Sequence, residues 1–227
     1  MAIEYVLAVG SKGAERLESV QFLYGEESKI LLQKAGLKPG MIVMDVGCGT
    51  GLMTKWLAEQ VGVTGEVIAI DNSESQLELA KKYIETNNIT NVKYLCKDIN
   101  ELSTNDLSHI DLLYSRLLLV HNKTPLSFIQ NLKDKCKKDM IYVFEEPITS
   151  ESECLPRSES FNKHLKLYCG LGQRAGFNYD FGELLSDLIL QVKLNIDGIR
   201  KTQNFFKEHP AKLIAYRRTR ECADKYL

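Results

Sequence analysis

Short apolar runs alternate with longer amphipathic stretches between residues 41 and 144. The runs have the length of β-strands and are rich in valine, isoleucine, leucine or methionine. We expect strands at 41–47, 66–71, 92–96, 110–113 and 140–144. Because these runs are nearly continuous rather than alternating, both faces of each strand should be covered.

The stretches between the runs carry apolar residues at helical spacing. One helix is expected after the first run and another after the second, where Asn72-Ser73 makes a good helix cap. Thr124-Pro125 opens a third before the last run, because proline is tolerated in a first helical turn. The first two helical faces consist of Leu52, Met53, Trp56 and Leu57, and of Leu77, Ala80 and Ile84. This order of strand and helix predicts an α/β fold with a parallel sheet doubly wound by helices.

The flanking segments do not continue the alternation. Residues 15–35 predict one or two helices, and residues 147–180 are polar, glycine-bearing and irregular, as expected of an inserted lid. Helix is expected again at 182–190, an alternating strand at 191–199, and helix from Thr202 onward. In the strand, Val192, Leu194 and Ile196 should face the core.

A chain of 227 residues is long enough for one good core, so we expect a single domain. It divides into an N-terminal helical cover (1–36), a core (37–147), a lid (148–180) and a C-terminal helix-strand-helix segment (181–227).

Composition narrows the class of protein. The formal net charge of −1 argues against a chain built to coat nucleic acid, although residues 200–227 carry eight Lys or Arg against three acids. The six cysteines are scattered, with no CxxC pair and no His/Cys cluster at metal-ligand spacing, as is usual in a reducing compartment. No apolar run approaches the roughly 18 residues of a membrane span. We therefore expect a soluble cytoplasmic protein without a metal site.

The strongest local signal is the glycine loop 45–51, Asp-Val-Gly-Cys-Gly-Thr-Gly, at the end of the first strand. Ligands of wound α/β sheets bind at the carboxyl ends of strands, and glycines let the backbone approach them closely. A dinucleotide site would need glycine at 52, where this chain has Leu52. Asp45 would repel a pyrophosphate but suits a ligand with an ammonium group.

Two further acids end the next two strands. Asp71 can accept hydrogen bonds from both hydroxyls of a ribose. Asp98, with the backbone N–H that follows it, can bind the amino edge of an adenine. Three acids at successive strand ends beside a glycine loop together indicate a nucleoside site.

The glycine loop, Ile70-Asp71-Asn-Ser73 and Lys97-Asp98-Ile99 resemble three consecutive motifs of class I S-adenosylmethionine-dependent methyltransferases. These motifs are most similar to those of the small-molecule group that includes ubiquinone and menaquinone methyltransferases. The segment 114–121 resembles that group's fourth motif. The resemblance implies a Rossmann-like, three-layer α/β/α methyltransferase fold with six parallel strands and one reversed.

The resemblance also implies a set of contacts with S-adenosylmethionine. Asp45 would hold the ammonium group, Asp71 the ribose, and Ser115-Arg116 would form the floor near the reactive methyl. The full set of cofactor-binding residues is Asp45, Gly47, Cys48, Gly49, Gly51, Asp71, Asn72, Gln76, Asp98, Ile99, Ser115 and Arg116. Residues 5–17 resemble a helix that covers the cofactor in some of these enzymes, with Tyr5 and Arg16 as contacts.

One departure concerns the end of the sheet. The family's sheet ends in an antiparallel hairpin, and only its first strand is expected here, at 191–199. Its partner should come from beyond Leu227 or be absent. We take this to indicate a truncated chain or a dimer that shields the sheet edge.

Displacement at a sulfonium needs alignment more than acid–base groups, so no catalytic residue is assigned. His121 could reach the acceptor, or it could be a helix-entry or surface histidine. Tyr168, Phe177 and Tyr179 could line an acceptor pocket or pack in the core. An Asn-Pro-Pro-Tyr motif is absent after the fourth strand, which disfavours DNA or glutamine as acceptor.

The sequence thus predicts methyl transfer from S-adenosylmethionine to a small molecule, with nucleic acid and membrane disfavoured as partners. Two alternatives stay open: a catalytically silent subunit that keeps the fold, and a nicotinamide-dependent oxidoreductase.

Overall fold

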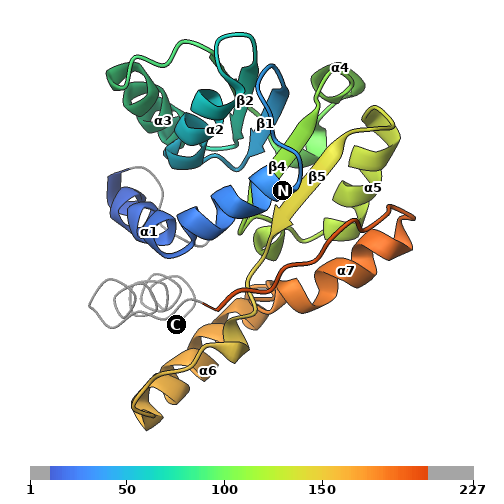
Figure 1. Cartoon of the computed structure of the whole chain (residues 1–227). Coiled ribbons are helices and arrows are strands. Elements are labelled where there is room, and N and C mark those ends of the chain that lie inside the picture. Colours follow the sequence, from blue (N-terminus) through green and yellow to red (C-terminus); the bar gives the residue numbers. More distant parts are fainter. Residues whose placement is uncertain (1–10, 204–227) are drawn as a thin grey trace.

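A five-stranded sheet forms the centre of the computed structural model, which describes residues 11–203 (Figure 1). The strands are β1 (Ile42–Val46), β2 (Glu66–Asp71), β3 (Val92–Cys96), β4 (Leu112–Arg116) and β5 (Ile141–Glu145). Their order across the sheet is β3-β2-β1-β4-β5, and every neighbouring pair is parallel. All five strands predicted between residues 41 and 144 are therefore confirmed, with β4 beginning two and ending three residues later than predicted and β5 shifted by one residue.

Helices fill the connections between the strands. The α-helices are α1 (Ser11–Lys34), α2 (Leu52–Val61), α3 (Glu74–Thr86), α4 (Thr104–Leu107), α5 (Pro125–Lys135), α6 (Glu159–Arg174) and α7 (Phe181–Gln191). Short 3₁₀ turns are η1 (Ile99–Glu101), η2 (Leu119–His121) and η3 (Thr149–Glu151). The N-terminal helical segment is thus one helix, and α5 starts at Pro125 as predicted.

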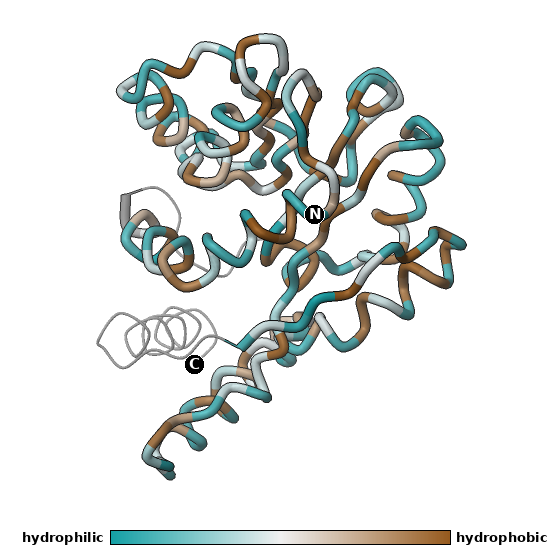
Figure 2. Tube along the Cα trace, in the orientation of Figure 1, coloured by the Kyte–Doolittle hydropathy of each residue, from teal (hydrophilic) through white to brown (hydrophobic). Residues whose placement is uncertain are grey.

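Two hydrophobic cores, one on each face of the sheet, make the fold three-layered. Side chains alternate along β1, so Val43 packs with α2 and the end of α1, while Met44 and Val46 pack with α4, α5 and α7. Figure 2 shows brown, apolar stretches along the strands and over much of α7. The predicted doubly wound α/β fold is confirmed.

The segment 148–180 was expected to be irregular, and that expectation is wrong. It contains the sixteen-residue helix α6, which is capped by Ser158, whose hydroxyl accepts a bond from the Phe161 N–H. Its glycines do not break it. A Cβ on Gly172 would lie 2.3 Å from the Tyr179 ring, so this glycine lets the chain after α6 fold back onto the helix.

The strand expected at 191–199 is also wrong. α7 continues to Gln191, and Lys193 then takes a left-handed conformation with φ 57°. The N–H groups of residues 192–194 bond back to carbonyls of residues 188–190, so they cannot join a sheet ladder. The predicted alternation survives only as burial: Val192 is buried and Leu194 half-buried.

The described residues contain five parallel strands and no reversed one, instead of the seven-stranded sheet that the resemblance implied. The idea of a truncated chain or an edge-shielding dimer rested on the strand at 191–199 and loses its basis with it. Tyr5 and nearly all of the helix predicted from Thr202 onward lie outside the described residues.

Replacing Phe128 with Ala should lower the free energy of unfolding by about 3–5 kcal/mol, because its ring is 0% exposed in the core under α5. Urea denaturation followed by circular dichroism measures this difference. Phe22→Ala is the matched control: its ring is 63% exposed on α1, so the change should stay within about 0.5 kcal/mol. Similar losses in both variants would contradict the assignment of the core.

Candidate functional site

The carboxyl ends of all five strands lie at one edge of the sheet, and a cavity opens there. The winding direction reverses beside β1, since β2 and β3 lie on one side of it and β4 and β5 on the other. Such a switch point is where open α/β sheets bind ligands. Loops from both halves of the sheet line the cavity, and α1 and the α6–α7 region cover it.

The cavity brings together all but two of the predicted cofactor-binding residues. Those that line it are Asp45, Gly47, Cys48, Gly49, Asp71, Asn72, Gln76, Asp98, Ile99 and Arg116. They come from the ends of four different strands and the loops and helix that follow. Arg16 of α1, a contact suggested by the resemblance, lines the same cavity.

The two exceptions are Gly51 and Ser115. Gly51 ends the loop at φ 81°, and a Cβ there would lie 3.0 Å from the Ala80 Cβ, so it lets α2 and α3 approach each other. Ser115 is fully buried and does not line the cavity. Its strand neighbours Tyr114 and Arg116 do, because successive side chains of a strand point to opposite faces.

The glycine loop is tied to the end of β2. The N–H groups of Gly47 and Cys48 both donate to the Ile70 carbonyl, at 2.8 and 2.9 Å. Gly47 has φ 73°, a conformation that other residues rarely adopt, and a Cβ there would lie 2.9 Å from the Leu118 side chain. The loop after β1 therefore fits between β2 and the loop after β4 only with glycine at this position.

Asp71 completes this tie through its carboxylate. One oxygen accepts from the Gly49 N–H at 3.0 Å and the other from the Ser73 N–H at 2.9 Å. Burial raises the pKa of Asp71, and these hydrogen bonds oppose the rise. Each carboxylate oxygen can accept a second bond, so the side chain retains capacity for two ligand hydroxyls.

Asp45 is a buried carboxylate, 3% exposed, whose Oδ2 accepts from the Thr54 hydroxyl at 2.6 Å. Burial raises its pKa to about 6, while the Thr54 bond and the Arg116 charge oppose the rise. At neutral pH the group is mostly ionised in a place that disfavours charge. A cationic group in the cavity would relieve that cost.

The β3 side of the cavity offers polar groups of two kinds. Asp98 caps η1 by accepting from the Asn100 N–H at 2.8 Å. Gln76 of α3 is 4% exposed, and its side-chain oxygen has no hydrogen-bond partner among the described residues. A buried amide oxygen without a donor is costly, which favours a ligand that supplies an N–H or O–H there.

Helix α1 is joined to the sheet through two charged groups, Arg116, which the sequence analysis singled out, and Glu145, which it did not. Arg116 donates to Ser28 at 3.0 Å and to Gln21 at 2.8 Å, both on α1. The Glu145 carboxylate accepts from Tyr114 at 2.7 Å and from Ser28 at 3.0 Å. The only available signal was the position of Glu145 at the end of the fifth strand, because the other acids of the site also lie at the ends of their strands.

The β4 side of the cavity has an aromatic wall. Tyr168 stacks on Tyr179 with ring centroids 4.2 Å apart, and the His121 ring meets Tyr179 edge-on at 6.0 Å. These three residues line the cavity, whereas Phe177 packs against His121 in the core behind it. Three of the four residues considered for an acceptor pocket are thus brought to the cavity.

Glu146 holds the loop that carries this wall. Its carboxylate accepts from the N–H groups of Leu118, Leu119 and Val120, at 3.1, 2.8 and 3.1 Å. Burial raises the pKa of Glu146 to about 8, against the effect of the three hydrogen bonds. Sequence reasoning missed this residue as well.

Comparison with known proteins agrees with this geometry. A family model described as a methyltransferase domain matches residues 37–202. A ubiquinone biosynthesis O-methyltransferase of Coxiella burnetii is 33% identical over 118 residues, 52% of this chain and 48% of that protein. A demethylmenaquinone methyltransferase of Staphylococcus aureus is 38% identical over 102 residues, 43% of this chain and 41% of that protein. The chain spans about half the length of the curated relatives it matches.

Solved structures show the same architecture. A SAM dependent methyltransferase from Aquifex aeolicus is 27% identical with a TM-score of 0.50, covering 66% of this chain and 78% of that one. A Bacillus halodurans structure, 20% identical with a TM-score of 0.55 over 74% of this chain and 68% of that one, shares the fold. Within residues 11–203, no helix is long and apolar enough to cross a membrane.

The raised pKa of Asp45 makes a pH-dependent contribution to stability. Its folded pKa of about 6 exceeds the ordinary value of 3.8, so its contribution is fully present below about pH 4 and is lost as pH rises through 6. Asp45→Asn keeps an oxygen for Thr54 and removes the charge. The variant should gain about 3 kcal/mol of unfolding free energy over the parent at pH 7 and little at pH 4. Urea titrations at the two pH values measure this, and an equal difference at both would show the assignment to be wrong.

Proposed function

We propose that this chain, which belongs to the methyltransferase domain family, transfers a methyl group from S-adenosylmethionine to a small molecule. The observation that carries the proposal is the cavity at the switch point. It combines a buried carboxylate, Asp45, with a glycine loop and the strand-end acid Asp71. The small-molecule acceptor is supported by the relatives named for ubiquinone and menaquinone methylation.

The residues present fit the cofactor. Asp45 would hold the ammonium group, because a cation stabilises a carboxylate that burial otherwise disfavours. Asp71 would accept from the ribose hydroxyls, and Gln76 would accept an N–H from the adenine edge. Asp98 and Ile99 line the same side of the cavity and would complete the adenine site.

The chemistry asks mainly for alignment. When bound, S-adenosylmethionine would supply a methyl group on a positively charged sulfur, and this sulfur keeps the electron pair of the broken bond as the acceptor bonds to the methyl carbon. The chain's part is to hold both partners in line and to exclude water, which can supply several kcal/mol. Helix α1 and the α6–α7 region cover the cavity and suit that role.

The alternatives differ in what they bind and turn over. A nicotinamide-dependent oxidoreductase would bind NAD in preference to S-adenosylmethionine in a side-by-side titration. A silent subunit would bind S-adenosylmethionine without transferring labelled methyl to any compound of a metabolite extract.

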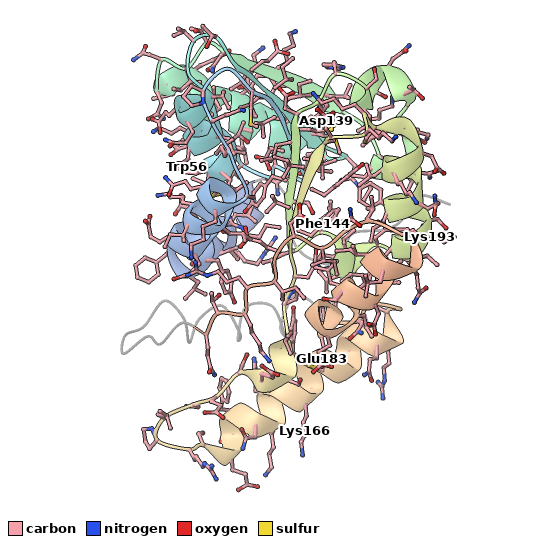
Figure 3. All side chains as sticks on the ribbon, turned by 45° about the vertical axis from the view of Figure 1, so that its right-hand side comes forward. Trp56, Asp139, Phe144, Lys166, Glu183 and Lys193 are labelled. Carbon is pink, nitrogen blue, oxygen red and sulfur yellow. The ribbon has the colours of Figure 1, made fainter. Side chains whose placement is uncertain are left out.

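Replacing Asp71 with Ala should weaken binding of S-adenosylhomocysteine at least about tenfold by calorimetry. The variant loses hydrogen bonds to a charged acceptor, each contributing about 1.5–3 kcal/mol, and the tie to Gly49. Asp139→Ala is the matched control, because this exposed acid lies before β5 at the opposite edge of the sheet (Figure 3). Unchanged affinity in the Asp71 variant, with its fold intact, would refute the ribose assignment.

Binding should also tighten the cover of the cavity. Amides of residues 11–24 in α1 and of residues 148–180 should exchange more slowly with S-adenosylhomocysteine bound, since both segments contribute residues to the lining of the cleft. Hydrogen exchange with and without the ligand measures this. Equal protection in both states would exclude ligand-linked closure.

A further inference from the structure

Asn122, directly after η2, is a buried amide with one half of its hydrogen bonding unused. It is 8% exposed and lines the cavity. Its side-chain oxygen accepts from the Thr124 N–H at 2.9 Å and lies 3.3 Å from the Thr124 hydroxyl. The side-chain nitrogen has no hydrogen-bond partner among the described residues.

The orientation of this amide is determined by its neighbour. A backbone N–H can only donate, so the group that faces Thr124 must be the oxygen. The NH₂ group therefore lies on the other side of the amide. Because a buried donor without an acceptor is costly, its retention beside a cavity points to a ligand atom that accepts a hydrogen bond.

The position of Asn122 separates it from the cofactor side. Gln76, the other buried amide with an unused atom in this cavity, follows β2, whereas Asn122 follows β4. The sheet order places these two strands on opposite sides of β1. The two amides thus line one cavity from opposite sides of β1, and Asn122 directly follows His121, whose ring meets Tyr179 of the stacked Tyr168–Tyr179 pair.

The surroundings of Asn122 define a ligand class. The wall consists of the stacked rings of Tyr168 and Tyr179 with His121 edge-on, and aliphatic Leu118 and Val120 line the cavity beside it. Aromatic faces favour flat conjugated partners, and a mostly apolar lining with one convergent polar group is typical of small-molecule sites.

We propose that Asn122 is a specificity-determining residue for the methyl acceptor, donating a hydrogen bond to an oxygen of a flat, conjugated ring that packs against Tyr168 and Tyr179. The inference rests on the proposed function, since it assigns to the acceptor the part of the cavity that the cofactor would not occupy.

The test uses the full chain saturated with S-adenosylhomocysteine and two probes of equal shape, 2-naphthol and naphthalene. Saturation-transfer NMR titrations give their affinities. The parent should prefer 2-naphthol about tenfold, the effect of one good hydrogen bond. Asn122→Leu keeps the size of the side chain and removes both its donor and its acceptor, so this preference should disappear. Asn122→Ala, checked by circular dichroism, should lose the preference as well.

A variant at the other end provides the matched comparison. Gln76→Met should weaken binding of S-adenosylhomocysteine and keep the preference for 2-naphthol, whereas the Asn122 variants should do the reverse. Retained preference in both Asn122 variants, weakened S-adenosylhomocysteine binding in them, or no preference in the parent would overturn the inference alone. A parent chain that does not bind S-adenosylhomocysteine would overturn the proposed function as well.

Discussion

The hydrogen bonds between the loop after β1 and the end of β2 are the constraint on which the site depends. Parallel strands bring their carboxyl ends to one edge, but loops at that edge need a partner that fixes their shape. Here the Ile70 carbonyl and the Asp71 carboxylate receive the N–H groups of Gly47, Cys48 and Gly49. The backbone of the loop is thereby held in place without any side chain of its own, which leaves the space above it for a ligand.

The acids Asp45 and Asp71 both lie at this edge of the sheet, and the repulsion between their negative charges has to be offset. The Cys48 thiol shows the effect of these negative charges. Burial raises the pKa of Cys48 well above its ordinary value, and the carboxylates of Asp45 and Asp71 raise it further. Backbone N–H groups and Arg116 offset part of this cost. A loop thiol in that field stays protonated at neutral pH, so the negative charge of the loop remains on the two carboxylates. A bound cation lowers the energy of the whole group.

The features that could be predicted from the sequence are those whose physical cause lies in residues close together along the chain. The five strands and the glycine loop were found because buried strands read as apolar runs and because glycine spacing excludes a dinucleotide site. Asp45, Asp71 and Asp98 were found because strand ends share one edge. The helix α6 was missed because Gly170 and Gly172 looked like breakers, whereas Gly172 accommodates the Tyr179 ring.

The remaining misses have a common physical origin in partners distant along the chain. The alternation at 191–199 corresponds to alternating burial of the side chains. A strand, however, also needs hydrogen bonds to a neighbouring strand, and the amides of residues 192–194 bond back to α7. Glu145 and Glu146 gain their roles from Ser28 and from the loop 118–120, and no local pattern announces either partner. Likewise, the unused nitrogen of Asn122 is visible only once Thr124 has taken its oxygen.

The segment that leaves β5 joins the parts of the site that the sheet alone would leave separate. Glu145 binds Ser28 of α1, so it fixes the cover that lies over the cavity. Glu146 binds the loop that carries Leu118 against Gly47 and places His121. The Pro147 carbonyl accepts from the Gly182 N–H, and a Cβ on Gly182 would lie 2.9 Å from the Glu146 carbonyl oxygen, so only glycine permits this approach of α7. Three consecutive residues thus connect the cover, the glycine loop and the aromatic wall. A shift of this strand end would therefore displace groups at both ends of the cavity together.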